Sequence, residues 1–133
     1  MIFLLDTHAF IWAVLDTSKL SQRVKGLLHD KNNEIFLSTV SFWEISLKVK
    51  LKKFSFDGVD AKSFPHYARE THFSIIPLRE AEAISFCELP VKENHRDPFE
   101  RMLIWQAITN GMTLISWDAF FGQYKIDGLK LAW

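Results

Sequence analysis

The first twelve residues, MIFLLDTHAFIW, constrain the fold more than any other stretch of the chain. Residues 2–5 form an unbroken apolar run, which predicts a strand that is covered on both faces, as in the middle of a parallel sheet. The run stops at Asp6, after which Thr7 or His8 could cap a helix whose apolar residues recur at helical spacing. Ligands of open parallel sheets bind where the carboxyl ends of strands meet the amino ends of helices. Asp6 is therefore a candidate site residue, although a lone aspartate could equally be a turn residue.

Apolar segments and helical patterns alternate along the rest of the chain. We expect further strands at 34–38, 73–76, 112–116 and 129–132, and helices at 21–29, 41–53, 61–71, 79–88 and 98–110. Pro98 at a first helical position and Gly111 beyond the last turn should bound the final helix. The alternation predicts one α/β domain over residues 1–133, a three-layer α/β/α sandwich with a mostly parallel sheet of four to five strands.

Composition adds limits on partners and location. With 48% hydrophobic residues, 12 Phe and 5 Trp, the chain can fill a core and leave aromatic surface for a partner. No apolar run approaches the roughly 20 residues of a membrane span, so we expect a cytoplasmic protein with no membrane partner. Cys87 cannot pair within the chain and is expected to be a small buried side chain. The net charge of zero makes no case for nucleic acid, which must come from local charge.

Acidic residues recur directly after predicted strands or in the first turn of the following helices. The set consists of Asp6, Glu44, Asp97, Glu100 and Asp118. Each has a structural explanation as a turn or cap residue, and Ser41 with Glu44 fits a capping box. Because the carboxyl ends of parallel strands share one edge, these carboxylates should nevertheless converge.

Converging carboxylates need a cation. Carboxylates within several ångströms repel each other by about 1 kcal/mol per pair even at high dielectric. Oxygen ligands without a cysteine or histidine cluster favour Mg²⁺ or Mn²⁺, and such ions assist phosphodiester hydrolysis. Only five glycines are present, and none forms a phosphate-cradling pattern after the first strand, which argues against a dinucleotide or P-loop site.

Several neighbours of the acids have both a functional and a structural interpretation. Thr7 and Ser116 could hydrogen-bond a carboxylate or a metal-bound water, or could simply cap helices. Arg101 could hold a phosphate or pair with a neighbouring acid. His8 and His95 lie near the acids by inference, and we interpret both as solvated loop or capping residues.

Four segments together resemble a known family. They are LLDTHAFIW at the start, SFWEISLKVKLKK in the 41–53 helix, HRDPFERMLIWQA in the 98–110 helix and LISWDAFFGQY after the fourth strand. Nearly from end to end, the chain resembles PIN-domain ribonucleases, in particular the VapC-type toxins of bacterial toxin–antitoxin pairs. The resemblance implies a PIN-like α/β/α sandwich, Mg²⁺- or Mn²⁺-dependent endoribonuclease activity on RNA, a cognate antitoxin protein as inhibitor, and a homodimer.

The motif positions assign the acids. By resemblance, Asp6, Glu44, Glu100 and Asp118 correspond to the four catalytic, metal-binding acids of the family. The family usually has aspartate where Glu100 stands, so Asp97, one turn away, could share or take over the third position.

Lysines crowd the end of the 41–53 helix, at Lys48, Lys50, Lys52 and Lys53. They suit the helix dipole and would usually be a solvated face. With an RNA substrate they become a candidate track for its phosphate backbone.

Other protein classes explain part of the pattern. A haloacid-type phosphatase, also metal-dependent, would place Asp6 after the first strand but requires a second aspartate where His8 stands. A receiver domain would need paired acids at the first strand and a lysine after a late strand, and neither is present. A non-catalytic α/β binding domain, in which the acids only cap helices, stays open as an alternative.

Overall fold

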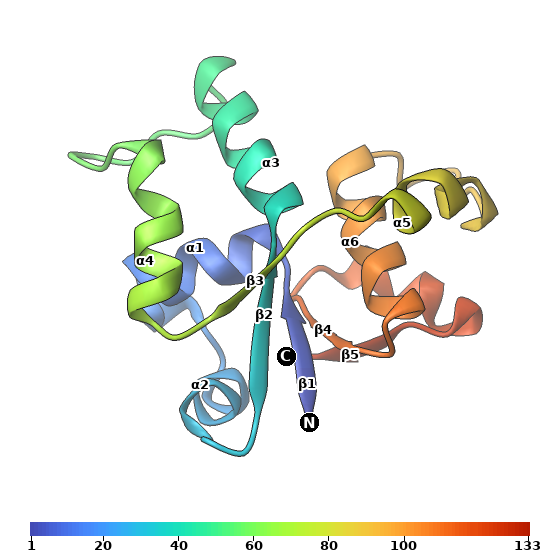
Figure 1. The fold of residues 1–133 in the computed structure, drawn as a ribbon, viewed down its shortest axis with the longest axis horizontal. Helices are drawn as coiled ribbons and strands as arrows, with labels where there is room; N and C mark the ends of the chain where they lie inside the picture. Colours follow the sequence, from blue (N-terminus) through green and yellow to red (C-terminus); the bar gives the residue numbers. More distant parts are fainter.

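One parallel sheet of five strands organises the fold (Figure 1). The computed structural model describes residues 1–133, and its strands lie in the order β3-β2-β1-β4-β5 with every neighbouring pair parallel. The strands are β1 (Ile2–Leu5), β2 (Glu34–Ser38), β3 (Ser74–Ile76), β4 (Thr113–Ile115) and β5 (Lys130–Ala132). The predicted α/β class with a parallel sheet is confirmed, and the apolar run at residues 2–5 is its central strand.

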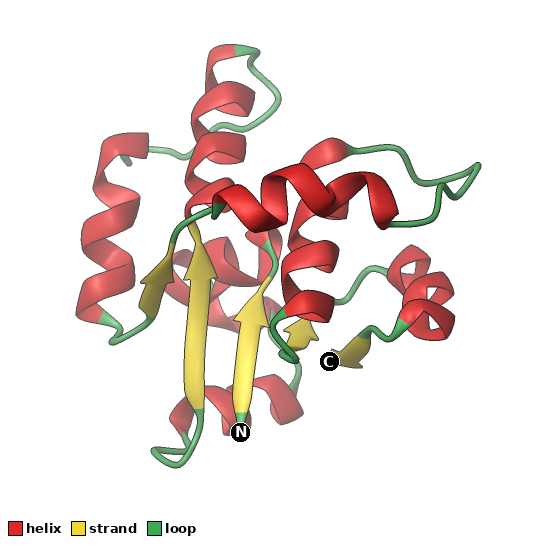
Figure 2. Ribbon diagram, turned by 45° about the vertical axis from the view of Figure 1, so that its right-hand side comes forward, coloured by secondary structure: helices red, strands yellow, loops and turns green.

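Helices connect the strands and cover both faces of the sheet (Figure 2). The α-helices are α1 (Thr7–Leu15), α2 (Gln22–His29), α3 (Thr39–Lys50), α4 (Phe64–Glu70), α5 (Glu80–Ser85) and α6 (Pro98–Thr109). Short 3₁₀ segments are η1 (Thr17–Lys19), η2 (Ala61–Ser63), η3 (Phe86–Glu88) and η4 (Ala119–Asp127). The predicted helices at 61–71 and 79–88 each prove to be a 3₁₀ turn joined to a short α-helix.

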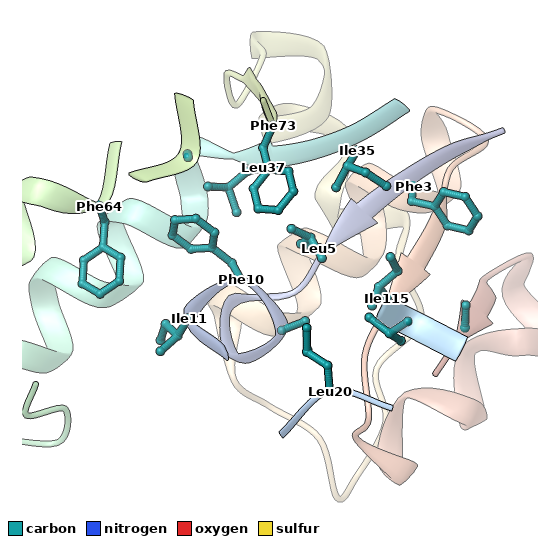
Figure 3. Close-up of a cluster of buried hydrophobic side chains, with 14 of the residues drawn as sticks. Phe3, Leu5, Phe10, Ile11, Leu20, Ile35, Leu37, Phe64, Phe73 and Ile115 are labelled. Atoms are coloured by element: carbon teal, nitrogen blue, oxygen red, sulfur yellow. The ribbon is translucent and has the colours of Figure 1, made fainter. Parts of the chain in front are cut away.

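Successive residues of β1 supply two cores, one on each face of the sheet. Phe3 and Leu5 belong to a cluster with residues of α1, α2 and α4, including Phe10 and Phe64 (Figure 3). Leu4 belongs to a second cluster, built mainly from α6 and η4. A strand buried on both faces has no position for a polar residue, which explains the continuous apolar run.

The helices that follow β1 and β2 begin earlier than the sequence predicted. Asp6 itself caps α1, because its Oδ1 accepts a 2.7 Å hydrogen bond from the backbone N–H of Ala9; the expectation that Thr7 or His8 is the cap was wrong. Ser38, the last residue of β2, caps α3 by accepting from Val40 N–H. No loop separates these strands from their helices, so each cap falls on or next to the strand end.

The early start of α3 removes one predicted motif. Ser41 lies inside the helix, so the capping box with Glu44 was wrong. By contrast, α6 has the predicted boundaries: Asp97 accepts from the N–H of Glu100 at 3.0 Å, and Gly111 follows the helix with a φ of 65°.

Two further observations concern the surface. Cys87 is exposed, so the expected buried side chain was wrong; α5 ends before it, and the residue lies in the η3 turn. None of the helices is both long enough and apolar enough to cross a membrane.

Candidate active site

The acids come from four different elements that lie at the carboxyl edge of the sheet. Asp6 follows β1 and its backbone N–H donates to the carbonyl of Ile115 at 3.0 Å, which joins the ends of β1 and β4. Glu44 lies on α3, Glu100 lies on α6, and Asp118 follows β4 as the cap of η4. In Figures 1 and 2, α3 begins directly beyond the arrowhead of β2.

Asp6 is buried at this edge, with only 5% of its surface exposed. Burial is the main reason that its pKa is raised from 3.8 to about 7, and the charges of Glu100 and Glu44 raise it further. The Ser116 hydroxyl and the Ala9 N–H act in the opposite direction. Glu44 and Glu100 are therefore close enough to Asp6 to affect its ionisation.

Glu44 is fully enclosed by polar partners. Its Oε1 accepts a 2.6 Å hydrogen bond from the hydroxyl of Thr7, and its Oε2 pairs with Lys48. The Thr7 oxygen also lies 3.0 Å from Oγ of Ser41. Thr7 thus contacts a carboxylate, in line with its functional interpretation, and Ser41 lies beside it as a hydrogen-bond partner of Thr7 and not as a helix cap.

Lys48 belongs to the acidic site and not to the helix surface. Its ammonium pairs with Glu44 and lies 3.5 Å from Oδ2 of Asp97, so it joins α3 to the start of α6. It also lies 5.4 Å from the ring centre of Phe54 and 5.9 Å from that of Phe99. Burial alone would lower the pKa of Lys48, but Glu44 and Asp97 raise it, so the side chain is a fixed positive charge.

The other predicted backbone-track lysines, Lys50, Lys52 and Lys53, are exposed. They lie at and beyond the carboxyl end of α3. The four lysines therefore separate into one that pairs with acids and three that face solvent.

The carboxylate of Glu100 is held by His95. The carboxylate Oε2 lies 2.6 Å from His95 Nε2, and His95 Nδ1 lies 2.8 Å from the hydroxyl of Tyr124. Burial raises the pKa of Glu100, with Asp97 and Asp118 adding to the effect and His95 opposing it. The solvated loop position expected for His95 was wrong, because the ring is buried against Phe121.

Arg101 lies away from the acids. Its guanidinium donates to the carbonyls of Leu89 and Pro90 at 3.0 and 3.1 Å and stacks over Phe86. It forms no ion pair with a carboxylate; its hydrogen bonds go to the Tyr124 hydroxyl and to the start of the 90–97 loop.

His8 is half-buried and not solvated. Its ring packs against Trp12 and Phe54 at centroid distances of 5.8 and 5.6 Å. Burial, assisted by the nearby Lys48 charge, lowers the pKa of His8. The ring lies at the apolar rim of the acidic site.

The donor set suits a hard divalent cation, but the side chains are held by internal partners. No group of three or more His, Cys, Asp or Glu side chains is arranged to hold an ion. Thr7 and Lys48 occupy both oxygens of Glu44, whereas His95 occupies Oε2 of Glu100 and leaves its Oε1 without a hydrogen bond. Oxygen-only donors with a buried aspartate are nevertheless the chemistry that Mg²⁺ and Mn²⁺ select.

An apolar groove adjoins the acids, between α3, α6 and η3. It has a volume of about 130 Å³ and is lined by Val40, Trp43, Leu78, Phe86, Pro98, Phe99 and Met102. The larger cavities, of about 510 and 490 Å³, lie among α1, α2 and the loop before β3, away from the acids. Trp43 and Phe99, which line the groove, are sequence neighbours of Glu44 and Glu100, whereas neither larger cavity is lined by a neighbour of these acids.

Comparison with known proteins identifies a family and a fold. A family model described as the PIN domain matches residues 3–126. Among solved structures, VapBC2 from Rickettsia felis bound to a DNA fragment from its promoter is 20% identical, with 99% of this chain and 98% of that chain covered and a TM-score of 0.69. DNA-bound VapBC from Salmonella typhimurium is 13% identical, with 99% and 97% covered and a TM-score of 0.68.

A third relative gives the same result. VapBC-1 from nontypeable Haemophilus influenzae is 15% identical, with 99% and 97% covered and a TM-score of 0.61. No curated protein sequence matches the chain. The similar structures share the whole length of the fold.

Proposed function

Because the chain belongs to the PIN-domain family, we propose that it is a metal-dependent endoribonuclease and the toxin of a type II toxin–antitoxin pair in the cytoplasm. The proposal is supported by the positions of Asp6, Glu44, Glu100 and Asp118 in elements at the carboxyl edge of one parallel sheet, and by the effect of the Glu44 and Glu100 charges on Asp6. The Asp6 pKa of about 7 reflects burial of this carboxyl among neighbouring acids. A cation bound there would favour the ionised form, and hydrolysis of a charged phosphodiester needs such a cation.

Asp6, Glu44, Glu100 and Asp118 would hold Mg²⁺ or Mn²⁺. When bound, the ion supplies charge neutralisation at the phosphate and activation of a water molecule. Thr7 fixes the rotamer of Glu44 through its 2.6 Å bond, and Ser116 orients Asp6 and receives the N–H of Asp118 at 3.2 Å.

We assign the third acid to Glu100 and not to Asp97. One oxygen of Asp97 accepts the helix N–H as a cap, and the other faces Lys48. Glu100 has only one of its oxygens engaged, by His95, and its charge acts on Asp6. Asp97 thus serves the helix and the lysine, which leaves Glu100 free to bind a metal.

The RNA substrate would be held by charge at the end of α3. Lys50, Lys52 and Lys53 are exposed and can contact phosphates without reading the base sequence. Lys48 is excluded from that role because its ammonium is occupied by Glu44 and Asp97.

An antitoxin would cover the apolar surface beside the acids. Trp43, Leu47 and Leu51 are 61%, 38% and 53% exposed and recur every fourth residue along α3. Trp43 also lines the groove next to the site. An amphipathic segment could pack on this stripe and bring an arginine to the carboxylates, since its planar fork satisfies two oxygens at once. A homodimer, implied by the resemblance, is part of the same proposal.

The proposal is tested by incubating the purified chain with a mixed RNA pool, with and without Mn²⁺. Cleavage that requires Mn²⁺ and is lost in Asp6→Asn supports it. A phosphatase would instead release phosphate from a small aryl phosphate and leave RNA intact. A non-catalytic binding domain would neither cleave RNA nor bind Mn²⁺ in a calorimetric titration.

A further inference from the structure

A chain of hydrogen bonds runs from Arg101 through Tyr124 and His95 to Glu100. Arg101 Nε–H lies 3.4 Å from the hydroxyl of Tyr124, that hydroxyl lies 2.8 Å from His95 Nδ1, and His95 Nε2 lies 2.6 Å from Glu100 Oε2. A carboxylate offers no hydrogen, so the imidazole presents its N–H at Nε2. Arginine can only donate, so the tyrosine hydroxyl accepts from it and has its own hydrogen available for Nδ1 of a neutral imidazole. For a neutral imidazole, every group then has a compatible role in one orientation and one tautomer.

The loop that carries His95 is fastened at several points, so the ring cannot easily leave its position. Arg101 donates to the carbonyls of Leu89 and Pro90, and Lys92 forms a 2.9 Å ion pair with Asp127 of η4. His95 is itself 6% exposed and packs edge-on against the rings of Phe121 and Tyr124. A buried histidine with both nitrogens engaged is a rigid support for whatever it contacts.

Glu100 needs such support. Its side chain has three rotatable bonds, it is partly exposed, and no hydrogen bond other than that from His95 holds its carboxylate. The bond engages Oε2 alone, which leaves Oε1 for a ligand. Without the bond, repulsion from Asp97 and Asp118 would favour rotamers that point away from the other acids.

We propose that His95 is a positioning residue that holds Glu100 at the acidic edge with Oε1 free for a ligand, and that Tyr124 orients His95. The inference rests on the proposed metal site and adds to it two residues that do not touch the metal. Partners that orient a metal ligand in this way are worth about 10- to 100-fold in metal affinity or activity.

The test measures Mn²⁺ binding by calorimetry on the intact, RNA-free chain. His95→Phe keeps the ring volume but removes both nitrogens, and is expected to weaken Mn²⁺ binding about tenfold or more. Tyr124→Phe removes only the hydroxyl and is expected to weaken it by roughly two- to tenfold. Lys92→Met is the matched control, since it loosens the same loop without touching the bond to Glu100, and should stay within about twofold.

A double-mutant cycle separates positioning from general stability. In a Glu100→Ala background, His95→Phe should cause no further loss of Mn²⁺ affinity, because the group that it positions is already gone. A loss of the same size in that background, or a Lys92→Met variant as weak as His95→Phe, would overturn the proposal. If the wild-type chain fails to bind Mn²⁺ at all, the proposed function fails; if it binds and His95→Phe binds equally well, only the positioning role fails.

A measurement on the wild-type chain covers the case in which His95→Phe does not fold. Nitrogen-15 NMR of the imidazole should show a protonated Nε2 and a bare, hydrogen-bonded Nδ1. Addition of Mg²⁺ should shift the Nε2 signal as Glu100 takes up the ion. The opposite tautomer, or a His95 signal that does not respond to bound Mg²⁺, would overturn the proposal.

Discussion

The hydroxyl of Thr7 donates a 2.6 Å hydrogen bond to Oε1 of Glu44, across the interface of α1 and α3. Both residues are at most 3% exposed, so the bond lies in an environment where water cannot replace it. Lys48 occupies the second oxygen of the same carboxylate. The rotamer of one acid is therefore set by partners from its own helix and from the helix after β1.

Replacing Thr7 tests that bond. Thr7→Val keeps the shape but leaves Oε1 of Glu44 without a donor, so the free energy of unfolding should fall by about 2 kcal/mol. Thr7→Ser retains the hydroxyl and is the control, expected to lose less than half as much. Urea denaturation of the three proteins compares them; equal stability of the valine and serine variants would show that the hydroxyl contributes little.

Asp6→Asn should abolish RNA cleavage while leaving the metal-free fold equally stable or more stable above neutral pH. The folded-state pKa of Asp6 is raised from 3.8 to about 7, so the folded protein keeps a proton that the unfolded chain has released. The wild type therefore loses stability relative to Asp6→Asn as the pH rises between these two values, by roughly 1.4 kcal/mol per pH unit. Above about pH 7 the difference should become constant, since both states are then ionised.

The measurement is urea unfolding of both proteins in a chelator, at several pH values across that window. The difference between the two proteins isolates Asp6 from other groups that titrate in the same range. A difference that does not change with pH would mean that the carboxyl is ionised throughout and is not crowded by the other acids.

Asp97→Ala and Glu100→Gln should separate the two acids of α6. Loss of the Asp97 cap should reduce the free energy of unfolding by about 1 kcal/mol and leave most RNA cleavage intact. Glu100→Gln should change stability little but nearly abolish cleavage, because a neutral amide is a poor ligand for a hard cation. Turnover and melting of both variants decide the assignment, and the reverse pattern would transfer the third position to Asp97.

The two kinds of lysine on α3 should give opposite results. Lys52→Ala removes an exposed charge, so it should weaken binding of a single-stranded RNA and reduce the salt dependence by about 0.7 for one phosphate contact. Lys48→Met should leave that slope unchanged and instead tighten Mn²⁺ binding, because the ion no longer competes with a fixed ammonium for Glu44. Fluorescence titrations on an Asp6→Asn background, which cannot cleave, measure the slope, and calorimetry measures Mn²⁺. If Lys48→Met also reduced the salt dependence of RNA binding, Lys48 would have to be counted among the lysines that contact the RNA phosphates.

Local patterns predicted those parts of the molecule that local interactions determine. The buried run of β1 and the capped start of α6 follow from adjacent residues, so the sheet edge and the positions of Asp6 and Glu100 could be anticipated. The helix starts at Asp6 and Ser38 could not, because a strand that enters a helix without a loop places the cap within the apolar pattern.

Contacts between segments that are distant in the sequence could not be predicted from local sequence patterns. His95 and Tyr124 are 29 residues apart, and they meet because the loop before α6 packs against η4. The pair of Lys48 with Glu44 is at helical spacing and could have been noticed, but its approach to Asp97 depends on how α3 and α6 pack. The buried histidine carried no sequence signal that distinguished it from a solvated one.

The final prediction concerns regulation by an antitoxin. If the partner inserts an arginine among the carboxylates, it occupies the place of the metal, so excess Mn²⁺ should weaken inhibition. Asp118→Asn removes one charge from the site without altering the apolar stripe on α3, and should weaken partner binding as well as cleavage. Trp43→Ala leaves the acids intact and should weaken partner binding while cleavage is retained, because this side chain is 61% exposed and packs beside the site without entering it. Calorimetry of the partner with the three proteins, with and without Mn²⁺, tests both anchors. Unchanged affinity of Asp118→Asn together with no effect of Mn²⁺ would mean that the inhibitor covers the groove and never reaches the acids.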